Sequence, residues 1–392
     1  MEFTAEHEAL RASVRDLVDR EINPHVDEWE RAGRFPAHAL FPLVAKIGLF
    51  GLEYDPAYGG EGADHSFTVV AAEELGRIDC GGVPMGIAVQ MAMATPSLHS
   101  YGSHDLKQRF LAPAIRGEVV CSIAVTEADA GSDVAGLRTR AVRDGDDWVI
   151  NGSKLFITNG AQADWICLLA RTSDEGGYRG MSQIIVETSR PGFRVSRTLD
   201  KLGNRSSDTA ELSFTDVRVP VSNTIGEIGR GFQQQMQQFQ PERMIASYLQ
   251  VGGLQKALDR TRDYLGQRRA FGRPLLANDH VAYRLAELSA RLDLLRHYNY
   301  ACADAYLRGE DTTRFATIAK LTVGRLAREI ADTCVQFHGG MGYMEETWTA
   351  RFYRDTRLIG IGGGADEVML SLLARLDGFI PDRRPTAVEG SP

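Results

Sequence analysis

The stretch Asp144-Gly145-Asp146-Asp147-Trp148-Val149-Ile150-Asn151-Gly152 marks a change of structural class within this 392-residue chain. Its centre is a short run of aromatic and β-branched residues, the composition that strands prefer. Asp144-Gly145 and Asn151-Gly152 are turn signals on either side of that run. Similar runs follow at residues 165–169, 183–186 and 211–214. Together they predict an antiparallel β domain at residues 119–231.

The chain on both sides of this domain has helical periodicity. Before it, Leu10, Val14 and Leu17 recur at the spacing of one helix face, and further helical stretches occupy residues 67–75 and 86–101. After it, apolar residues line long amphipathic stretches with short links, which is typical of a bundle. We therefore expect an α+β fold of four segments: an N-terminal helical domain (1–118), the β domain (119–231), a C-terminal four-helix bundle (232–380) and a flexible polar tail (381–392).

Composition excludes several classes of function. With 44 Lys and Arg against 52 Asp and Glu, the net charge is −8, so we expect no nucleic-acid partner. No run of 18 apolar residues suggests a membrane span, and residues 1–24 lack the apolar region of a signal peptide. The five cysteines form no CxxC pair, and no HExxH is present, so we expect no metal site and a cytoplasmic, reducing location.

Two glycine-rich stretches are candidates for ligand binding. Gly360-Ile-Gly-Gly-Gly-Ala365 fits the dinucleotide fingerprint GxGxxG/A, but it follows a charged helical region rather than a strand, which argues against a Rossmann site. Ala124-Val-Thr-Glu-Ala-Asp-Ala-Gly-Ser-Asp-Val-Ala-Gly136 combines hydroxyls, amides and glycines in a short polar segment. Such a segment suits ring heteroatoms or phosphates, although a plain turn-rich linker would explain it equally well.

The second stretch resembles the first signature of the acyl-CoA dehydrogenases, a flavoprotein family. Four further stretches resemble that family in the same order along nearly the whole chain. They are Asn151-Gly-Ser-Lys-Leu-Phe-Ile-Thr-Asn-Gly160, Lys201-Leu-Gly-Asn-Arg-Ser-Ser-Asp-Thr209, Gln267-Arg-Arg-Ala-Phe-Gly272 and Val335-Gln-Phe-His-Gly-Gly-Met-Gly-Tyr343. The family fold also has the α, β, α-bundle arrangement that the sequence pattern predicts.

The resemblance implies an oxidoreductase that uses FAD to convert an acyl-CoA thioester to the trans-2-enoyl-CoA, as in the β-oxidation of fatty acids. It also implies a homotetramer (a dimer of dimers) that passes electrons to an electron-transferring flavoprotein. Three alternatives stay open: an acyl-CoA oxidase, a dehydrogenase of a carrier-protein-bound acyl group, and a non-catalytic acyl-CoA-binding subunit. The sequence does not specify the acyl group, the electron acceptor or the pathway.

The resemblance assigns the cofactor and substrate contacts residue by residue. Hydroxyl and amide donors near the flavin ring could steady the charge that a ring accepting hydride develops, and a guanidinium fork suits the pyrophosphate. Without the motifs, Phe156 would be ordinary core, Arg268 a solvated helix end and Arg243 an ion-pair partner. The residues implied for FAD are Val125, Thr126, Ser132, Phe156, Thr158, Arg268, Phe271, Gln336, Gly339, Gly340, Ala365 and Glu367, and those for the acyl-CoA are Ser132 and Arg243.

The catalytic base is the most informative departure from the family pattern. Many members carry their Glu in a loop near the C-terminus, where this chain has Gly363. Isovaleryl- and long-chain-type members instead place a Glu before an Arg on a bundle helix, and here Glu242 precedes Arg243. The resemblance therefore implies Glu242 as the base. Pro241 suggests a helix start at this point, so Glu242 could instead stabilise a helix N-terminus.

Two weaker signals concern the ligands. The segment 82–94, presumed to line the acyl pocket, carries small residues, methionines and Pro84. This composition predicts a roomy pocket for long, branched or bulky acyl groups, although Met and Ala at helical spacing are also ordinary core. His280 stands where many members carry a Gln near the adenine side of the cofactor.

Overall fold

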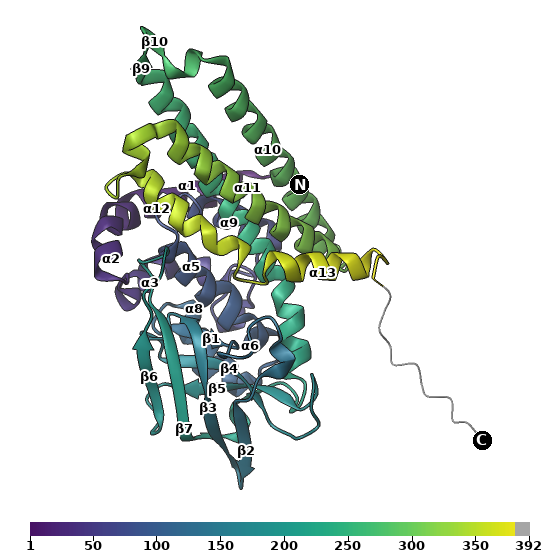
Figure 1. The fold of residues 1–392 in the computed structure, drawn as a ribbon. Coiled ribbons are helices and arrows are strands. Elements are labelled where there is room, and N and C mark those ends of the chain that lie inside the picture. Colours follow the sequence, from purple (N-terminus) through teal and green to yellow (C-terminus); the bar gives the residue numbers. More distant parts are fainter. Residues whose placement is uncertain (381–392) are drawn as a thin grey trace, which may run out of the picture.

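The computed structural model describes residues 1–380, in which the β-sheet domain follows one helical region and precedes another in sequence and lies at one end of the molecule (Figure 1). The predicted flexible tail at 381–392 lies outside the described residues. All five cysteines are free and buried. Within residues 1–380, no helix has both the length and the apolar character needed to cross a membrane.

The N-terminal region is helical, as predicted. Its helix ends follow local rules: for example, the Asp64 side chain accepts a hydrogen bond from the Ser66 amide and caps α4. A π-helical turn, η5 (Val89–Ala94), joins α5 to α6. The helices are α1 (Ala5–Leu17), α2 (Val26–Ala32), α3 (Ala37–Ala45), α4 (His65–Leu75), α5 (Gly82–Ala88), α6 (Pro96–Tyr101), α7 (His104–Leu106) and α8 (Ala112–Ile115).

The middle region is a sheet with the strand order β6-β7-β3-β2-β4-β5-β8, and β1 pairs with β4 beside this path. Most pairs are antiparallel, as predicted, but β1 and β2 both run parallel to β4. The strands are β1 (Cys121–Ala124), β2 (Arg140–Asp144), β3 (Asp147–Thr158), β4 (Trp165–Arg171), β5 (Met181–Glu187), β6 (Phe193–Thr198), β7 (Thr209–Pro220) and β8 (Thr224–Ile225).

One predicted turn is wrong. Asp144-Gly145 does lie at the β2–β3 hairpin, where Asp144 pairs with Asp147. Asn151-Gly152, in contrast, lies inside β3, where the register with β7 shifts between Ile150 and Gly152. Gly152 has a φ of +147°, so this pair of residues forms a bulge in a long strand rather than ending it.

Strand β4 explains how the sheet attaches to the N-terminal helices. Ile166 and Leu168 face the core of the β domain, whereas Trp165 and Cys167 join a cluster with apolar residues of α6 and the segment 106–111. A strand buried on both faces has no polar alternation, which is why residues 165–169 form a continuous apolar run. This packing places the N-terminal helices against one face of the sheet.

The C-terminal region contains three long helices and two shorter ones, with a small hairpin at one end (Figure 1). Met244, Tyr248, Val251 and Leu254 recur at helical spacing along α9 and are all buried. The elements are α9 (Gly231–Gln267), β9 (Arg269–Ala270), β10 (Arg273–Pro274), α10 (Asp279–Leu307), α11 (Thr313–His338), α12 (Trp348–Thr356) and α13 (Asp366–Leu376).

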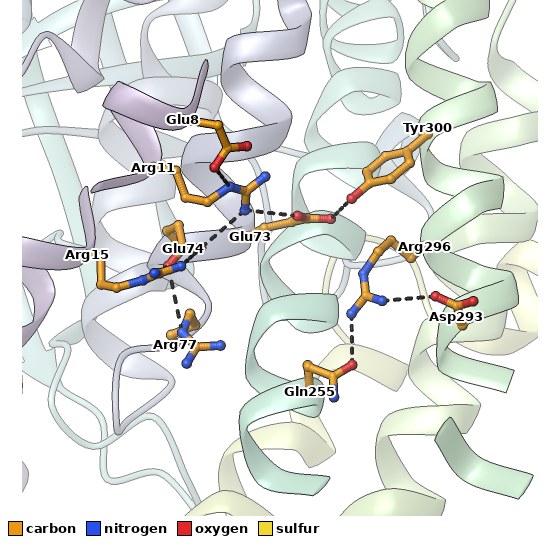
Figure 2. Close-up of polar contacts among 10 residues, drawn as sticks. All are labelled: Glu8, Arg11, Arg15, Glu73, Glu74, Arg77, Gln255, Asp293, Arg296 and Tyr300. Carbon is orange, nitrogen blue, oxygen red and sulfur yellow. Dashed lines mark hydrogen bonds and ion pairs between the residues drawn. The ribbon is translucent and has the colours of Figure 1, made fainter. Parts of the chain in front are cut away.

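A charged network joins α1, α4 and α10, next to a cavity of about 250 Å³ (Figure 2). The Glu74 carboxylate lies 3.1 Å from a nitrogen of Arg11 and 2.8 Å from one of Arg15. Glu73 accepts a hydrogen bond of 3.0 Å from the Tyr300 hydroxyl. Because the partners come from both helical regions, this network helps to fix α9 and α10 relative to the N-terminal helices.

Candidate active site

Glu242 lies in the interior of α9, contrary to the predicted helix start. The helix already begins at Gly231, ten residues before Pro241. The start is set by tertiary packing, since a Cβ atom on Gly231 would lie 2.6 Å from the Gln183 backbone nitrogen of β5. Pro241 has no N–H to donate to the carbonyl of Gln237, so the helix has one hydrogen bond fewer just before Glu242. A role for Glu242 at a helix N-terminus is thereby excluded.

The carboxyl group of Glu242 has an unusual environment for an acid. Burial raises its pKa to about 8, and the hydrogen bond from Gln238 and the charge of Arg243 oppose that rise. The Gln238 side-chain amide donates to Oε1 of Glu242 at 2.7 Å. A carboxyl group with a pKa near the working pH can accept a proton and release it again, as a general base must.

Arg243 points toward the C-terminal loop rather than toward a carboxylate. Its Nε donates to the Gly363 carbonyl at 3.3 Å, and its guanidinium carbon lies 5.8 Å from the centre of the Phe239 ring. The Lys320 ammonium group donates to the carbonyl of Gly364 in the same loop. The two cations therefore tie this loop to α9 and α11. The loop position at which many family members carry a base thus contacts the residue that follows Glu242, and of the two positions only Glu242 carries a carboxylate.

Lys320 is a site residue that is not among the residues predicted from the sequence. It lies on the buried face of α11, and burial lowers its pKa to about 8. A lysine on an otherwise apolar helix face is a usable signal, because a buried ammonium group needs a partner. The partner is a backbone carbonyl, which sequence periodicity cannot identify.

The residues implied for the flavin ring gather where β1 ends beside β3. The Val125 carbonyl accepts from the Lys154 ammonium group at 2.9 Å, and the Leu155 amide donates to the Thr126 carbonyl at 2.9 Å. Phe156 is 63% exposed with a φ of 63°, at a register shift of β3. It is therefore not core, which removes the alternative that periodicity left open.

Two other residues implied for this region differ in how firmly they are held. The Thr158 carbonyl accepts from the Ser122 hydroxyl at 2.5 Å, which ties the end of β3 to β1. Ser132 lies on the exposed loop between β1 and β2. An exposed aromatic ring beside a polar loop suits a flat heteroaromatic group with hydrogen-bonding edges, so the residues present fit a flavin.

Five of the remaining cofactor candidates lie far from these residues in the same chain. Arg268 and Phe271 lie at the β9–β10 hairpin, at the end of the molecule opposite the sheet (Figure 1). Gln336, Gly339 and Gly340 lie at the end of α11, which a ring stack of 4.2 Å between Tyr264 and His338 holds beside α9. All five residues are exposed, and Phe271 is fully so. One chain therefore presents two separate groups of cofactor candidates.

Ala365 and Glu367 lie at the start of α13, next to the loop that Arg243 and Lys320 hold. The stretch 360–365 lies between a 3₁₀ turn and α13 rather than after a strand. This agrees with the interpretation that its GxGxxG pattern is not a Rossmann fingerprint. His280 is exposed in the first turn of α10.

The glycines of the presumed acyl-pocket segment have a different role from the predicted one. A Cβ atom on Gly82 would lie 2.4 Å from the Ser206 hydroxyl, and one on Gly86 would lie 2.6 Å from the Phe35 ring. Both glycines therefore allow close packing and provide no open volume. Met91 is buried in the core of the N-terminal region, whereas the Met93 carbonyl faces Gln238 of α9.

Comparison with known proteins agrees with this fold. The sequence matches three family profiles: acyl-CoA dehydrogenase N-terminal domain at residues 4–118, middle domain at 122–217 and C-terminal domain at 229–376. The chain therefore belongs to the acyl-CoA dehydrogenase family, whose members are FAD-dependent oxidoreductases acting on the CH–CH group.

Individual relatives cover almost the whole chain. Long-chain specific acyl-CoA dehydrogenase of Sus scrofa is 37% identical over 95% of this chain and 86% of its own length. A crystal structure of a putative acyl-CoA dehydrogenase from Mycobacterium smegmatis has a TM-score of 0.94 at 42% identity, covering 97% of this chain and 99% of that one. A glutaryl-CoA dehydrogenase from M. smegmatis, solved with FADH2, has a TM-score of 0.91 at 27% identity, and the match covers 97% of each chain.

Proposed function

We propose that this chain catalyses the α,β-dehydrogenation of an acyl-CoA to the trans-2-enoyl-CoA, with Glu242 as the base. The observation that carries the proposal is the position of Glu242. Its pKa is raised to about 8 by burial, and its neighbour Arg243 contacts the Gly363 loop. Where many family members have their base, this chain has a glycine, and the nearby carboxyl group replaces it.

The proposed proton transfer starts from the ionised form of Glu242. The carboxylate takes one proton from the α-carbon of the thioester, and the electron pair of that C–H bond becomes part of the new double bond. FAD, when bound, supplies the acceptor for the hydride that leaves the β-carbon. The raised pKa of Glu242 lies closer to the pKa of the α-carbon acid than that of an ordinary carboxylate would. The smaller difference in pKa favours the proton transfer.

The same proposal gives roles to the other candidates. Thr126, Val125, Phe156 and Thr158 would contact the flavin ring, with Ala365 and Glu367 close to it. Ser132 would reach both the cofactor and the substrate, and Arg243 would reach the thioester. Phe156, Ser132 and Glu367 are exposed and the other residues are partly buried, so all of them retain some accessible surface, which supports this assignment.

We infer that a second copy of the chain completes the cofactor site. Arg268, Phe271, Gln336, Gly339 and Gly340 are exposed at the end of the molecule away from the β1–β3 site (Figure 1). A fully exposed Phe271 costs free energy in water, and burial against a cofactor held by another chain would remove that cost. A homotetramer built as a dimer of dimers would meet this requirement.

The preferred substrate is proposed to be a long or bulky acyl-CoA, and electrons would leave to an electron-transferring flavoprotein. The Sus scrofa relative is a long-chain specific acyl-CoA dehydrogenase, which supports long acyl chains, whereas the close packing of Gly82 and Gly86 gives no support. The five free, buried cysteines support a reducing compartment, and we place the enzyme in the cytoplasm.

Anaerobic mixing of the purified protein with a panel of acyl-CoA thioesters tests this function. We expect a yellow protein whose flavin absorbance bleaches, fastest with long or branched acyl groups. A colourless protein, or a yellow one that no thioester bleaches, would favour a non-catalytic binding subunit. Rapid peroxide release in air would identify an oxidase, and a sharp optimum at butyryl-CoA would contradict the proposed pocket.

A further inference from the structure

We propose that Gln238 is the positioning residue that orients Glu242 and keeps its carboxyl group ionisable. This inference rests on the proposed role of Glu242 as the base and adds to it. Gln238 lies one helical turn before Glu242 on α9 and is 5% exposed. Its side chain is the described hydrogen-bond donor to the Glu242 carboxylate.

Both ends of the Gln238 side-chain amide are engaged. Its carbonyl oxygen accepts from the Ser97 backbone amide at 3.1 Å and from the Ser97 hydroxyl. Its nitrogen donates to the Met93 carbonyl and, at 2.7 Å, to Oε1 of Glu242. Met93 belongs to η5 and Ser97 to α6, so one side chain of α9 spans the junction between these two elements.

Two backbone groups decide which way the amide points. The Ser97 N–H can only donate, so the atom that faces it must be the amide oxygen. The Met93 carbonyl can only accept, so the atom that faces it must be the amide nitrogen. These two backbone partners therefore fix the orientation of the amide. The second N–H of the amide can then only point toward Glu242.

This arrangement has two consequences for the base. A neutral group that can only donate stabilises the ionised carboxylate, so it lowers the pKa that burial raises. It also limits rotation of the carboxyl group, because the donor is fixed on two sides by the N-terminal region. A carboxylate that is already oriented toward the α-proton abstracts it more readily than one that rotates freely.

The sequence supplies a matched control at the preceding position. Gln237 is exposed, accepts a hydrogen bond from the Tyr101 hydroxyl and lines a separate cavity. Gln238→Leu removes the donor to Glu242, and Gln237→Leu makes the same chemical change away from it. Gln238→Met, which is unbranched like Gln, serves if the leucine variant does not fold.

The test is the pH dependence of kcat/KM for the holoenzyme with a saturated acyl-CoA. Loss of one hydrogen bond to the Glu242 carboxylate should raise the apparent pKa of the acidic limb of this profile by about one unit. We expect Gln238→Leu to be about tenfold slower than the wild type at pH 7, to recover most of that loss at high pH, and to retain its flavin absorbance. Gln237→Leu should keep the wild-type profile.

An unshifted acidic limb in both Gln238 variants would overturn the inference, as would an equal loss of rate at every pH. The Glu242→Gln variant separates this outcome from failure of the proposed function. If Glu242→Gln retains turnover, Glu242 is not the base and the proposed mechanism fails. If Glu242→Gln is inactive while Gln238→Leu titrates like the wild type, only the role of Gln238 is wrong.

Discussion

Two carboxylates near the proposed site, Glu242 on α9 and Glu127 beside the β sheet, show opposite electrostatic designs. Glu127 accepts from the Arg138 amide at 2.7 Å, the Thr139 amide at 2.9 Å and the Lys154 ammonium group at 2.9 Å. Burial raises the pKa of Glu127, but the Lys154 charge and these hydrogen bonds outweigh it, and the net shift is downward. Glu242 has one described hydrogen-bond donor, and its pKa rises to about 8.

The difference shows what makes a buried acid structural or reactive. Glu127, which is saturated with donors, stays ionised and links neighbouring segments of the chain. Glu74 also links two partners, Arg11 and Arg15 (Figure 2). A carboxylate with one neutral donor retains the capacity to take up a proton near neutral pH. The same residue type thus serves stability in one region and chemistry in the other.

The largest expected effect is on turnover. Glu242→Gln keeps the shape of the side chain but cannot accept the α-proton, so kcat should fall by about 10²- to 10⁴-fold. Steady-state assays with a long-chain acyl-CoA measure this loss, and flavin absorbance shows whether FAD is retained. Substantial turnover in this variant would show that Glu242 is not the base.

The next effect is on stability. Glu127→Gln should leave the fully buried Lys154 ammonium group without its counter-charge, at a cost of about 3–5 kcal/mol in the free energy of unfolding. Urea or thermal unfolding measures the change. Glu118→Gln, which breaks an exposed pair with Arg116, should change stability little. Equal stabilities of all three proteins would contradict the structural role of Glu127.

A comparable effect concerns how the free energy of unfolding depends on pH. The folded pKa of Glu242, about 8, lies above its ordinary value of 4.5, so ionising this group destabilises the folded state. Each unit of that difference is worth about 1.4 kcal/mol. Relative to Glu242→Gln, the wild type should lose stability as the pH rises from about 5 to 8, with no further change above. Thermal melts of both proteins across this pH range check the direction of the change. A difference in stability between the two proteins that stays constant with pH would mean that Glu242 has an ordinary pKa.

The acidic limb of the Gln238 variants is the finest probe of the comparison. It measures whether the single donor, Gln238, lowers the pKa of Glu242, as several donors lower the pKa of Glu127. A shift of about one pH unit, with an unchanged Gln237→Leu control, is the expected result.

Much of the fold could be predicted from the sequence because its signals are local. The strand runs at 165–169 and 183–186 and the apolar face of α9 are visible as periodicity, and β4, β5 and α9 occupy these positions. Two local signals were misleading. Asn151-Gly152 forms a bulge in β3, and Pro241 lies inside α9, because pairing with β7 and packing against β5 outweigh the preferences of these residues.

The site itself was only partly predictable. The Glu-Arg pair and the missing loop carboxylate pointed to Glu242 through the family resemblance, and that assignment remains a prediction. The partners of Glu242 could not be predicted, since Gln238 meets Ser97 across 141 positions and Arg243 meets Gly363 across 120. Such contacts depend on how the helical regions pack together, so no periodic pattern in the sequence reveals them.

Deuterium exchange at the α-carbon tests the central claim most directly, because it isolates proton transfer from oxidation. The enzyme, with its flavin held reduced, is incubated with a long-chain acyl-CoA in D₂O, and deuterium in the thioester is measured by mass spectrometry. We expect exchange by the wild type, with a rate that rises toward pH 8, and none above background by Glu242→Gln. Exchange by Glu242→Gln at the wild-type rate would show that another group removes the proton.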